Sequence, residues 1–455
     1  MKTSAEVVIC GAGIGGIATA YFLSVRHGIK DILLVDERAP LSLTSDKSTE
    51  CYRNWWPGPG DAMVQMMTRG IDLLEEFAIE SKNLFHLNRR GYLYATADPN
   101  RVAGLEGFAE EASSLGAGEI RCHPQGSSNT YRPAESVGFQ DALGGADLIT
   151  DRNLIQEHFP YLSPDVAGLL HVRRAGWLSA QQYGMYLFDQ ARANGIKFVS
   201  DKIVDVVIES GHISGIQLAG GEEIRTSTFI IAAGPLAAEV GKMLEIDIPV
   251  FNELHMKAAF NDGQGVIRRD APLLIYTDEQ ELDWKEEERA ALAEEEDTRW
   301  LTETLPSGAH VRPEGGLGAE TIILLWDTRE EEVEPILPPP IDPMYAEVTL
   351  RGLTKMIPGL EAYLERLPKP YIDGGYYTKT RENRPLACPL PVDGAYLIGA
   401  MSGFGIMSSA ALGELTAAHI THTALPVYAP AFDLTRYLDP GYLALLENWG
   451  DNWQL

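Results

Sequence analysis

A glycine-rich turn near the start of the chain limits the fold more than any other feature. The apolar run Val7–Cys10 is followed directly by Gly-Ala-Gly-Ile-Gly-Gly at positions 11–16, and an apolar segment with helical spacing comes next. The order strand, glycine turn, helix is typical of a dinucleotide-binding unit. Gly11 permits the sharp bend, Gly13 admits a pyrophosphate and Gly16 lets the helix pack closely on the strand. The sequence therefore predicts a dinucleotide at the amino end of this helix.

A second apolar strand, residues 31–35, ends in two carboxylates, Asp36 and Glu37. An acidic residue about 20 positions after the last glycine is placed to accept hydrogen bonds from ribose hydroxyls. Successive strand residues point in opposite directions, so we favour Asp36 over Glu37 as the ribose ligand. The residues of the turn expected to contact the cofactor are Gly11, Gly13, Ile14, Gly15 and Gly16.

The segment after the second strand, residues 44–58, is rich in hydroxyl side chains and includes Ser48 and Thr49. At this point the chain resembles the flavin-dependent D-amino-acid oxidase superfamily, in particular the branch with sarcosine oxidase and dimethylglycine dehydrogenase. The Ser48-Thr49 pair is similar to the Ser/Thr loop of that family. The resemblance implies FAD as the cofactor, a choice that the glycine turn alone leaves open.

The resemblance continues in the middle of the chain. Strands are expected at 202–208 and 228–233, separated by a short glycine-bounded hairpin. In the family, one strand holds the adenine through its backbone and another ends in Ala-Ala-Gly. These features imply cofactor contacts at Ile203, Ala233 and Gly234, although buried aliphatic residues are also ordinary core.

A second glycine turn follows the strand 395–399, and a small-residue helix is expected from about 408 to 421. The positive end of a helix dipole beside reduced flavin would stabilise the negative charge that the ring gains. The resemblance implies that this turn lies beside the flavin ring. Its expected contacts are Gly403, Phe404, Gly405, Ile406 and Met407.

Two positions depart from the family pattern. Met407 stands where sarcosine oxidases have a lysine, so lysine-assisted oxygen activation is not implied, and the electron acceptor is left open among oxygen, a quinone and a protein. Cys51 stands where dimethylglycine dehydrogenases have a histidine bonded to flavin. We therefore expect non-covalent FAD, with a link through Cys51 or Cys388 as the alternative.

Cationic and aromatic residues near the two cofactor loops are candidates for binding a substrate carboxylate. Arg53, Tyr377 and Arg381 are the expected catalytic residues, and residues 376–385 carry a local excess of +2 in an acidic chain. Further candidates are Tyr376, Lys379 and Arg384, together with His255, Tyr276 and Trp326 on expected strands.

Charge and cysteine content exclude several classes of protein. The 455 residues include 37 Lys+Arg and 65 Asp+Glu, a net charge of −28, which disfavours nucleic acid and anionic lipid as partners. The segment 278–299 contributes −8 and 327–334 contributes −4, which predicts a solvated acidic exterior. The four cysteines are widely spaced, so neither a metal site nor a disulfide framework is expected. With no run of 18 apolar residues, we expect no membrane span and a cytoplasmic location.

These observations predict an α/β fold with a Rossmann-like, doubly wound and discontinuous FAD-binding domain, formed by 1–95, 150–235 and 370–455. Residues 96–149 and 236–369 are expected to form an α+β substrate domain on a mostly antiparallel sheet, with an acidic insertion at 278–299.

The expected activity is FAD-dependent oxidation of a C–N bond in a small, carboxylate-bearing amine or amino acid. Hydride transfer to flavin N5 would give an imine that hydrolyses. The alternatives are a 2-hydroxy-acid or polyol dehydrogenase of the same superfamily, and a flavin-binding interaction module that docks through 278–299.

Overall fold

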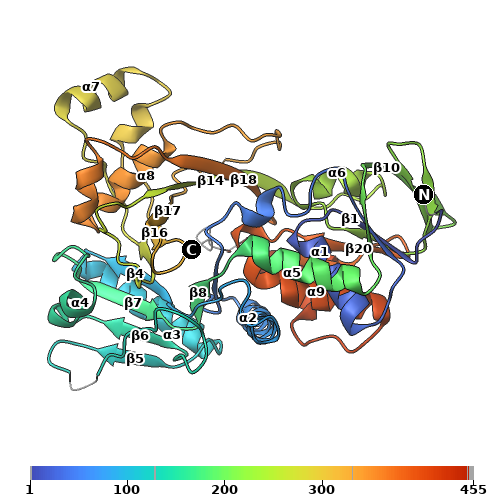
Figure 1. Cartoon of the computed structure of the whole chain (residues 1–455), viewed down its shortest axis with the longest axis horizontal. Helices are drawn as coiled ribbons and strands as arrows, with labels where there is room; N and C mark the ends of the chain where they lie inside the picture. Colours follow the sequence, from blue (N-terminus) through green and yellow to red (C-terminus); the bar gives the residue numbers. More distant parts are fainter. Residues whose placement is uncertain (1–2, 128–129, 330, 448, 450–455) are drawn as a thin grey trace.

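The computed structural model describes residues 3–127, 130–329, 331–447 and 449. Two lobes, each built on its own sheet, lie side by side, and the long strands β14 and β18 reach from one toward the other (Figure 1). The outer ends of the predicted segments 1–95 and 370–455, and Glu330 in the second acidic run, lie outside the described residues.

The first lobe contains the expected glycine turn and a six-stranded sheet. The strands run in the order β19 (Leu386–Pro389), β20 (Ala395–Gly399), β13 (Phe229–Ile231), β1 (Val7–Cys10), β2 (Ile32–Asp36) and β9 (Lys197–Ser200). All neighbours are parallel except β19 and β20. The chain thus returns to this sheet from distant segments, which is the discontinuous Rossmann-like arrangement that the sequence predicted.

Strand alternation divides this lobe into two cores. Val7 and Ile9 face one core, whereas Val8 faces the other. The first core contains residues of helices α1 (Ile14–Tyr21), α2 (Ala62–Glu80), α5 (Ala180–Ala193) and α9 (Gly405–Thr421). The second contains residues of helix α6 (Ala237–Lys242) and of the antiparallel strands β10 (Ile203–Glu209), β11 (His212–Leu218) and β12 (Glu223–Arg225).

The second lobe is built on a nine-stranded sheet. Its order is β18 (Tyr371–Lys379), β14 (Phe251–Asn261), β17 (Thr321–Leu325), β16 (Ala309–Pro313), β15 (Leu273–Tyr276), β4 (Tyr92–Thr96), β7 (Gly168–Val172), β6 (Ala146–Ile149) and β5 (Ile120–His123). Only the pairs β15–β4 and β5–β6 are parallel among the neighbours in this sheet. The prediction of a mostly antiparallel sheet is confirmed.

Three strands of the nine-stranded sheet come from segments that the sequence prediction gave to the cofactor domain. They are β4, β7 and β18, which lie within or across 1–95, 150–235 and 370–455. Each pairs with strands far away along the chain, and local patterns carry no signal for such pairing. The described structure therefore divides these segments between the two sheets.

The remaining elements join or cover these sheets. They are helices α3 (Val102–Ser114), α4 (Arg152–His158), α7 (Glu286–Glu294), α8 (Tyr345–Thr354) and α10 (Pro440–Leu446), and the ribbon of β3 (Cys51–Arg53) with β8 (Ala175–Trp177). Helix α7, at the edge of the second lobe in Figure 1, has no buried residue. The acidic segment is nevertheless anchored, because the buried carboxylate of Asp278 accepts hydrogen bonds from Thr96 Oγ1 (2.5 Å) and Ala97 N (2.8 Å). Among the helices that the structure describes, none combines the length and apolarity needed to cross a membrane.

Candidate active site

The glycine turn has the close packing that its sequence predicted. Gly11 has a φ of +111°, and a Cβ on Gly16 would lie 2.0 Å from the carbonyl oxygen of Gly11. Side chains at these two positions would collide with backbone atoms that cannot move aside. Helix α1 consequently begins directly against the carboxyl end of β1.

The first of three connected cavities, the nucleotide cavity, opens beside this turn. Its lining residues include the predicted Gly11, Gly13, Asp36, Glu37, Ile203, Ala233 and Gly234. Asp36 accepts hydrogen bonds from the backbone N–H groups of Ala12 (2.8 Å) and Arg38 (2.9 Å), which fix its carboxylate in the cavity wall. Glu37 forms an ion pair with Arg38 at 2.6 Å.

The second cavity, the ring cavity, runs from the glycine turn to the amino end of α9. Its lining residues include the predicted Gly13, Ile14, Gly15, Ser48, Gly234, Gly403, Gly405 and Ile406. It shares Gly13, Thr44, Ser45, Ala232, Gly234 and Pro235 with the nucleotide cavity, so the two form one path. The sequence prediction passed over Ser45, whose hydroxyl accepts a hydrogen bond from Ile14 N at 3.0 Å.

The turn before α9 has features of a ligand-binding segment. Ala400 and Ser402 adopt φ values of +52° and +46°, a strained region for residues other than glycine. The buried Ser402 Oγ lacks a hydrogen-bond partner within the part of the chain that the structure describes. This hydroxyl and the amino end of α9 both border the ring cavity, where they are placed to bind an electron-rich ligand.

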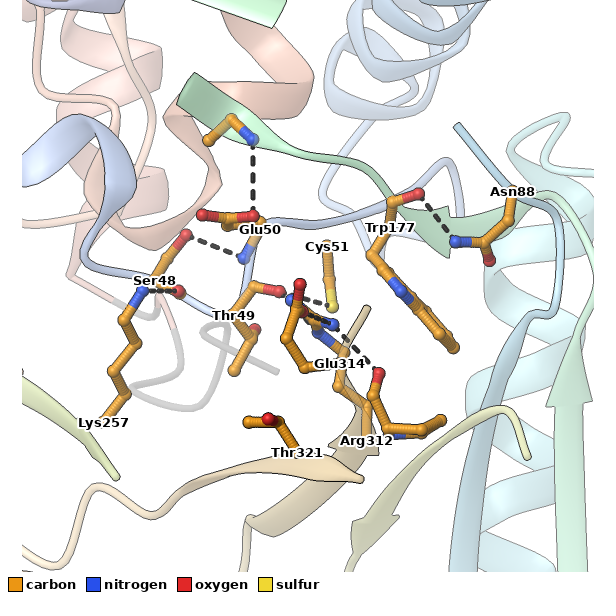
Figure 2. A network of polar contacts seen from close by, with 12 residues as sticks. Ser48, Thr49, Glu50, Cys51, Asn88, Trp177, Lys257, Arg312, Glu314 and Thr321 are labelled. Atoms are coloured by element: carbon orange, nitrogen blue, oxygen red, sulfur yellow. Dashed lines mark hydrogen bonds and ion pairs between the residues drawn. The ribbon is translucent and has the colours of Figure 1, made fainter. Parts of the chain in front are cut away.

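The Ser/Thr loop is fixed by two cations from the nine-stranded sheet, as Figure 2 shows. Lys257 on β14 donates to the carbonyl oxygens of Ser48 (3.0 Å) and Asp46. Arg312 on β16, fully buried, donates from Nε to the carbonyl oxygen of Thr49 (2.7 Å) and pairs with Glu314. The second lobe thus positions the loop that borders the cofactor groove.

The third cavity, the inner cavity, lies between the sheet of the second lobe and the turn before α9. Its lining residues are Thr49, Cys51, Arg53, Tyr92, Leu273, Ile275, His310, Leu325, Asp327, Tyr377, Gly403, Phe404 and Met407. Five strands of the nine-stranded sheet contribute to it, together with β3, which carries Cys51 and Arg53. Alternate residues of a strand share a sheet face: His310 lines the cavity, whereas Val311 packs in the core on the opposite side. The inner cavity shares Tyr377 and Gly403 with the ring cavity.

Arg53 is a buried cation in the inner cavity, 4% exposed. Its Nε donates to the carbonyl oxygen of Trp55 (3.2 Å), and the guanidinium lies 4.3 Å from the ring centre of Trp56. Its Nη2 is buried without a hydrogen-bond partner, and no carboxylate of the described residues forms an ion pair with it. The structure thus places Arg53, an expected catalytic residue, in the wall of the inner cavity. Met407 also lies here, and its Sδ accepts a hydrogen bond from Arg53 N at 3.5 Å.

Tyr377 lines the inner cavity and stacks on His255, with ring centres 3.9 Å apart. His255 belongs to a group of buried charged side chains in contact with one another. Nε2 of His255 is 3.0 Å from Glu253, its Nδ1 is 2.7 Å from Asp327, and Glu253 also pairs with Lys379. Burial would lower the pKa of His255, but Asp327 and Glu253 together raise it above the usual value. Burial would raise the pKa values of Glu253 and Asp327, but their cationic neighbours lower both.

His310 lines the inner cavity but was not among the candidate site residues predicted from the sequence. It lies on strand β16. The available sequence signal was the position of His310 between two apolar residues. In the structure these two neighbours face the opposite core. Burial lowers the pKa of His310 below its usual value.

Several predicted substrate residues lie elsewhere. Arg381 is exposed in the turn after β18 and lines neither the ring cavity nor the inner cavity. The reason is that β18 ends at Lys379, so the chain has already left the sheet face. Tyr376 lines the ring cavity, where its hydroxyl donates to Ile336 O and accepts from Ile336 N, both at 2.8 Å. Arg384 donates to the carbonyl oxygen of Pro59.

Tyr276 and Trp326 belong to the core on the far side of the nine-stranded sheet and do not line the inner cavity. Both were expected to line the substrate pocket. They alternate with Ile275 and Leu325, which do line it, so the expectation was wrong by one residue in strand register. The buried Cys388 is on β19, in the second core of the first lobe.

The model of the FAD-dependent oxidoreductase (DAO) family matches residues 6–419. The chain belongs to this family. The match includes both glycine turns and all three cavities, so the chain is an FAD-dependent oxidoreductase of the D-amino-acid oxidase superfamily.

Solved structures share the fold of this FAD-dependent oxidoreductase. L-proline dehydrogenase from P. horikoshii is similar with a TM-score of 0.72 and 20% identity, covering 96% of this chain and 99% of that one. Glycine oxidase from Geobacillus kaustophilus has a TM-score of 0.71 and 14% identity over 96% and 99% of the two chains. Iminodiacetate oxidase from Chelativorans sp. BNC1 has a TM-score of 0.68 and 15% identity over 94% and 98%.

A curated relative is the mitochondrial regulatory subunit of pyruvate dehydrogenase phosphatase from Mus musculus. It is 21% identical over 282 residues, which are 61% of this chain and 28% of that protein. The chain therefore spans just over a quarter of the length of that relative.

The residues present fit FAD. The nucleotide and ring cavities form one groove past the helix α1 amino end, with a fixed carboxylate at one end and the unpaired Ser402 hydroxyl at the other. The acidic groups near the nucleotide cavity suit ribose hydroxyls, and the α9 end suits a ring that gains negative charge. When bound, FAD supplies the acceptor of two electrons and a proton.

Proposed function

We propose that this oxidoreductase oxidises a C–N bond of an amino acid or related carboxylate-bearing amine. The observation that carries the proposal is Arg53, a buried guanidinium with an unpaired Nη2 in the inner cavity. A buried cation without a partner is costly, and a bidentate carboxylate removes that cost. The solved structures of similar fold include proteins named for proline, glycine and iminodiacetate as substrates.

The proposed arrangement assigns one task to each cavity residue. Arg53 binds the carboxylate, and Tyr377 donates a hydrogen bond to it, because burial raises the pKa of the Tyr377 hydroxyl and keeps it protonated. Leu273, Ile275 and Leu325 exclude water from the reacting carbon. Since Tyr377 and Gly403 border both cavities, the substrate's Cα lies next to the ring cavity.

The experiment is anaerobic reduction of the bound FAD, followed by its visible absorbance, with matched sets of amino acids, N-methyl amino acids, 2-hydroxy acids and amines without a carboxylate. Amino acids or their N-methyl derivatives should bleach the flavin. Bleaching by 2-hydroxy acids alone would overturn the amine proposal and favour the hydroxy-acid alternative. No bleaching by any donor, with flavin bound, would favour the binding module.

The Arg53→Met variant tests the carboxylate anchor. Hydrogen bonds to charged groups contribute about 1.5–3 kcal/mol, so the Kd for an amino acid should rise about 10- to 150-fold. Reduction by an amine without a carboxylate should be unchanged, and this comparison separates a binding role from general damage. An equal loss for both substrates would contradict the assignment.

We further propose that FAD is bound non-covalently. Burial raises the pKa of the Cys51 thiol, which keeps the thiolate scarce, and its Sγ donates to the carbonyl oxygen of Thr49 at 3.2 Å. Acid precipitation should leave the yellow colour in the supernatant. A yellow pellet would show covalent attachment.

A further inference from the structure

His310 is a buried histidine, 5% exposed, for which the carboxylate-binding arrangement gives no task. Its neighbours on β16, Ala309 and Val311, pack in the opposite core, so the imidazole is held on the inner-cavity face of the sheet. It lines the same cavity as Arg53 and Tyr377.

One hydrogen bond sets the tautomer of this imidazole. Nδ1 of His310 is 2.8 Å from the carbonyl oxygen of Gly308, and a carbonyl oxygen can only accept. Nδ1 therefore carries the hydrogen, and in the neutral ring Nε2 has the lone pair. Burial lowers the pKa of His310, so the ring is neutral at pH 7. No residue that the structure describes makes a hydrogen bond to Nε2.

The charges around this imidazole couple it to substrate binding. The charged and titratable groups that face it from neighbouring elements are Arg53, Arg312, Asp327, Tyr377, Cys51 and Tyr92. After burial, the hydrogen bond to Gly308 and then the charge of Asp327 raise the pKa of His310, whereas Arg53 and Arg312 lower it. Arg53 lowers the pKa of His310 because its positive charge disfavours a protonated imidazole nearby. A carboxylate bound to Arg53 cancels part of this charge, so substrate binding itself makes His310 a stronger base.

We propose that Nε2 of His310 accepts the proton that the substrate's ammonium group must lose before its Cα–H bond breaks. This inference rests on the proposed function and adds the proton acceptor to it. The N–H bond breaks, the proton moves to Nε2, and the electron pair stays on nitrogen. That pair is then available to form the C=N π bond, for which bound FAD would supply the acceptor of the Cα hydrogen and its bonding pair. The proton on His310 returns to water as the product leaves.

Asp327, the other basic group in the cavity, is less suited to this task. Its Oδ1 is already 2.7 Å from Nδ1 of His255. Burial would raise its pKa, but the contact with His255 lowers it below the usual value, so its carboxylate is the weaker base.

The first test uses a ligand that cannot react. 2-Aminoisobutyrate has a carboxylate and an ammonium group but no Cα hydrogen, and isobutyrate lacks the ammonium group. In the FAD-loaded protein labelled with 15N-histidine, we expect NMR to show the Nδ1–H tautomer of His310, assigned by its absence in His310→Asn. Adding 2-aminoisobutyrate should shift the 15N resonance of Nε2, because this nitrogen accepts a hydrogen bond from the ammonium group, whereas isobutyrate should not. Arg53-dependent binding that leaves the Nε2 resonance unchanged would overturn only this inference, and binding of neither ligand would count against the proposed function.

The second test is the pH profile of flavin reduction at saturating substrate. His310→Asn retains a donor for the Gly308 carbonyl but removes Nε2. A general base contributes about 10²- to 10⁴-fold, so reduction at pH 7 should slow by at least about 100-fold. As the pH increases, the rate of flavin reduction in His310→Asn should rise tenfold per pH unit and approach the wild-type rate near the pKa of the free amine. A loss of equal size at every pH, or none, would overturn the inference. His419→Asn, in the last turn of α9, is the control and should leave the profile unchanged.

Discussion

Replacing Glu253 by glutamine should destabilise the protein strongly, because this carboxylate pairs with the buried Lys379 and also contacts the buried His255. The side chains of His255, Lys379 and Glu253 are 1%, 7% and 9% exposed. Removing one member of a buried ion pair costs about 3–5 kcal/mol. In this variant Nδ1 of His255 still has Asp327 as a partner, at 2.7 Å, so only Lys379 loses its carboxylate partner. We therefore expect the free energy of unfolding to fall by an amount at the low end of this range, about 3 kcal/mol.

The assay is urea unfolding of the FAD-loaded protein at pH 7 and fixed concentration. Glu332→Gln is the matched control, because the side chain of Glu332 is exposed and its backbone lies opposite Glu253 in an isolated β-bridge. This variant should change the free energy of unfolding by less than about 0.5 kcal/mol. The double variant Glu253→Leu with Lys379→Met should recover most of the loss, because no buried charge is orphaned. A loss below about 1 kcal/mol in Glu253→Gln would refute the assignment of a buried charge network.

The same network gives the stability a defined pH dependence. The pKa of His255 is raised, so its contribution is complete below the unfolded value of about 6.5 and is lost as the pH rises through the folded value. The pKa values of Glu253 and Asp327 are lowered, so their contributions are present above the usual carboxylate range and are lost as the pH falls through the folded values. Urea unfolding should show that His255→Gln loses the alkaline limb of this dependence and keeps only a reduced acidic limb, because Lys379 still lowers the pKa of Glu253.

Three further outcomes can be measured. Gly16→Ala should lower FAD retention and cost at least about 1–3 kcal/mol, since its Cβ would lie 2.0 Å from a backbone oxygen; Gly104→Ala, with open space around it, should be neutral or stabilising, and equal effects would contradict this reasoning. Arg312→Met should weaken FAD affinity in equilibrium dialysis through the loss of the 2.7 Å bond to Thr49, whereas an unchanged affinity would show that the loop needs no such support. Mass spectrometry should show iodoacetate labelling Cys51 faster than iodoacetamide does, relative to exposed Cys122, because the anion is drawn to the inner cavity; the opposite order would argue against a cationic site.

Local chemistry made the cofactor groove predictable from sequence. The two glycine turns are short segments whose backbone demands are visible in the residues themselves, and the carboxylate after β2 lies at a fixed distance along the chain. Arg53 and Tyr377, which line the inner cavity, were selected from the sequence because they lie near the two segments expected to contact the cofactor.

The substrate face was less predictable because it depends on pairing between distant strands. Its residues come from five strands of the nine-stranded sheet and from β3, and which side chains share a face depends on register. His310 was therefore missed, and Tyr276 and Trp326 were assigned to the wrong face of the sheet. Arg381 was predicted as a catalytic residue although β18 ends at Lys379, before Arg381 is reached.

The shared wall formed by Tyr377 and Gly403 has a consequence for engineering new specificity. A substitution there would reshape two compartments at once, so a gain for a new substrate would be linked to a change in flavin reactivity. Leu273, Ile275 and Leu325 border the inner cavity alone. Variant libraries confined to these three aliphatic positions would change the size and shape of the inner cavity and leave the lining of the ring cavity unchanged.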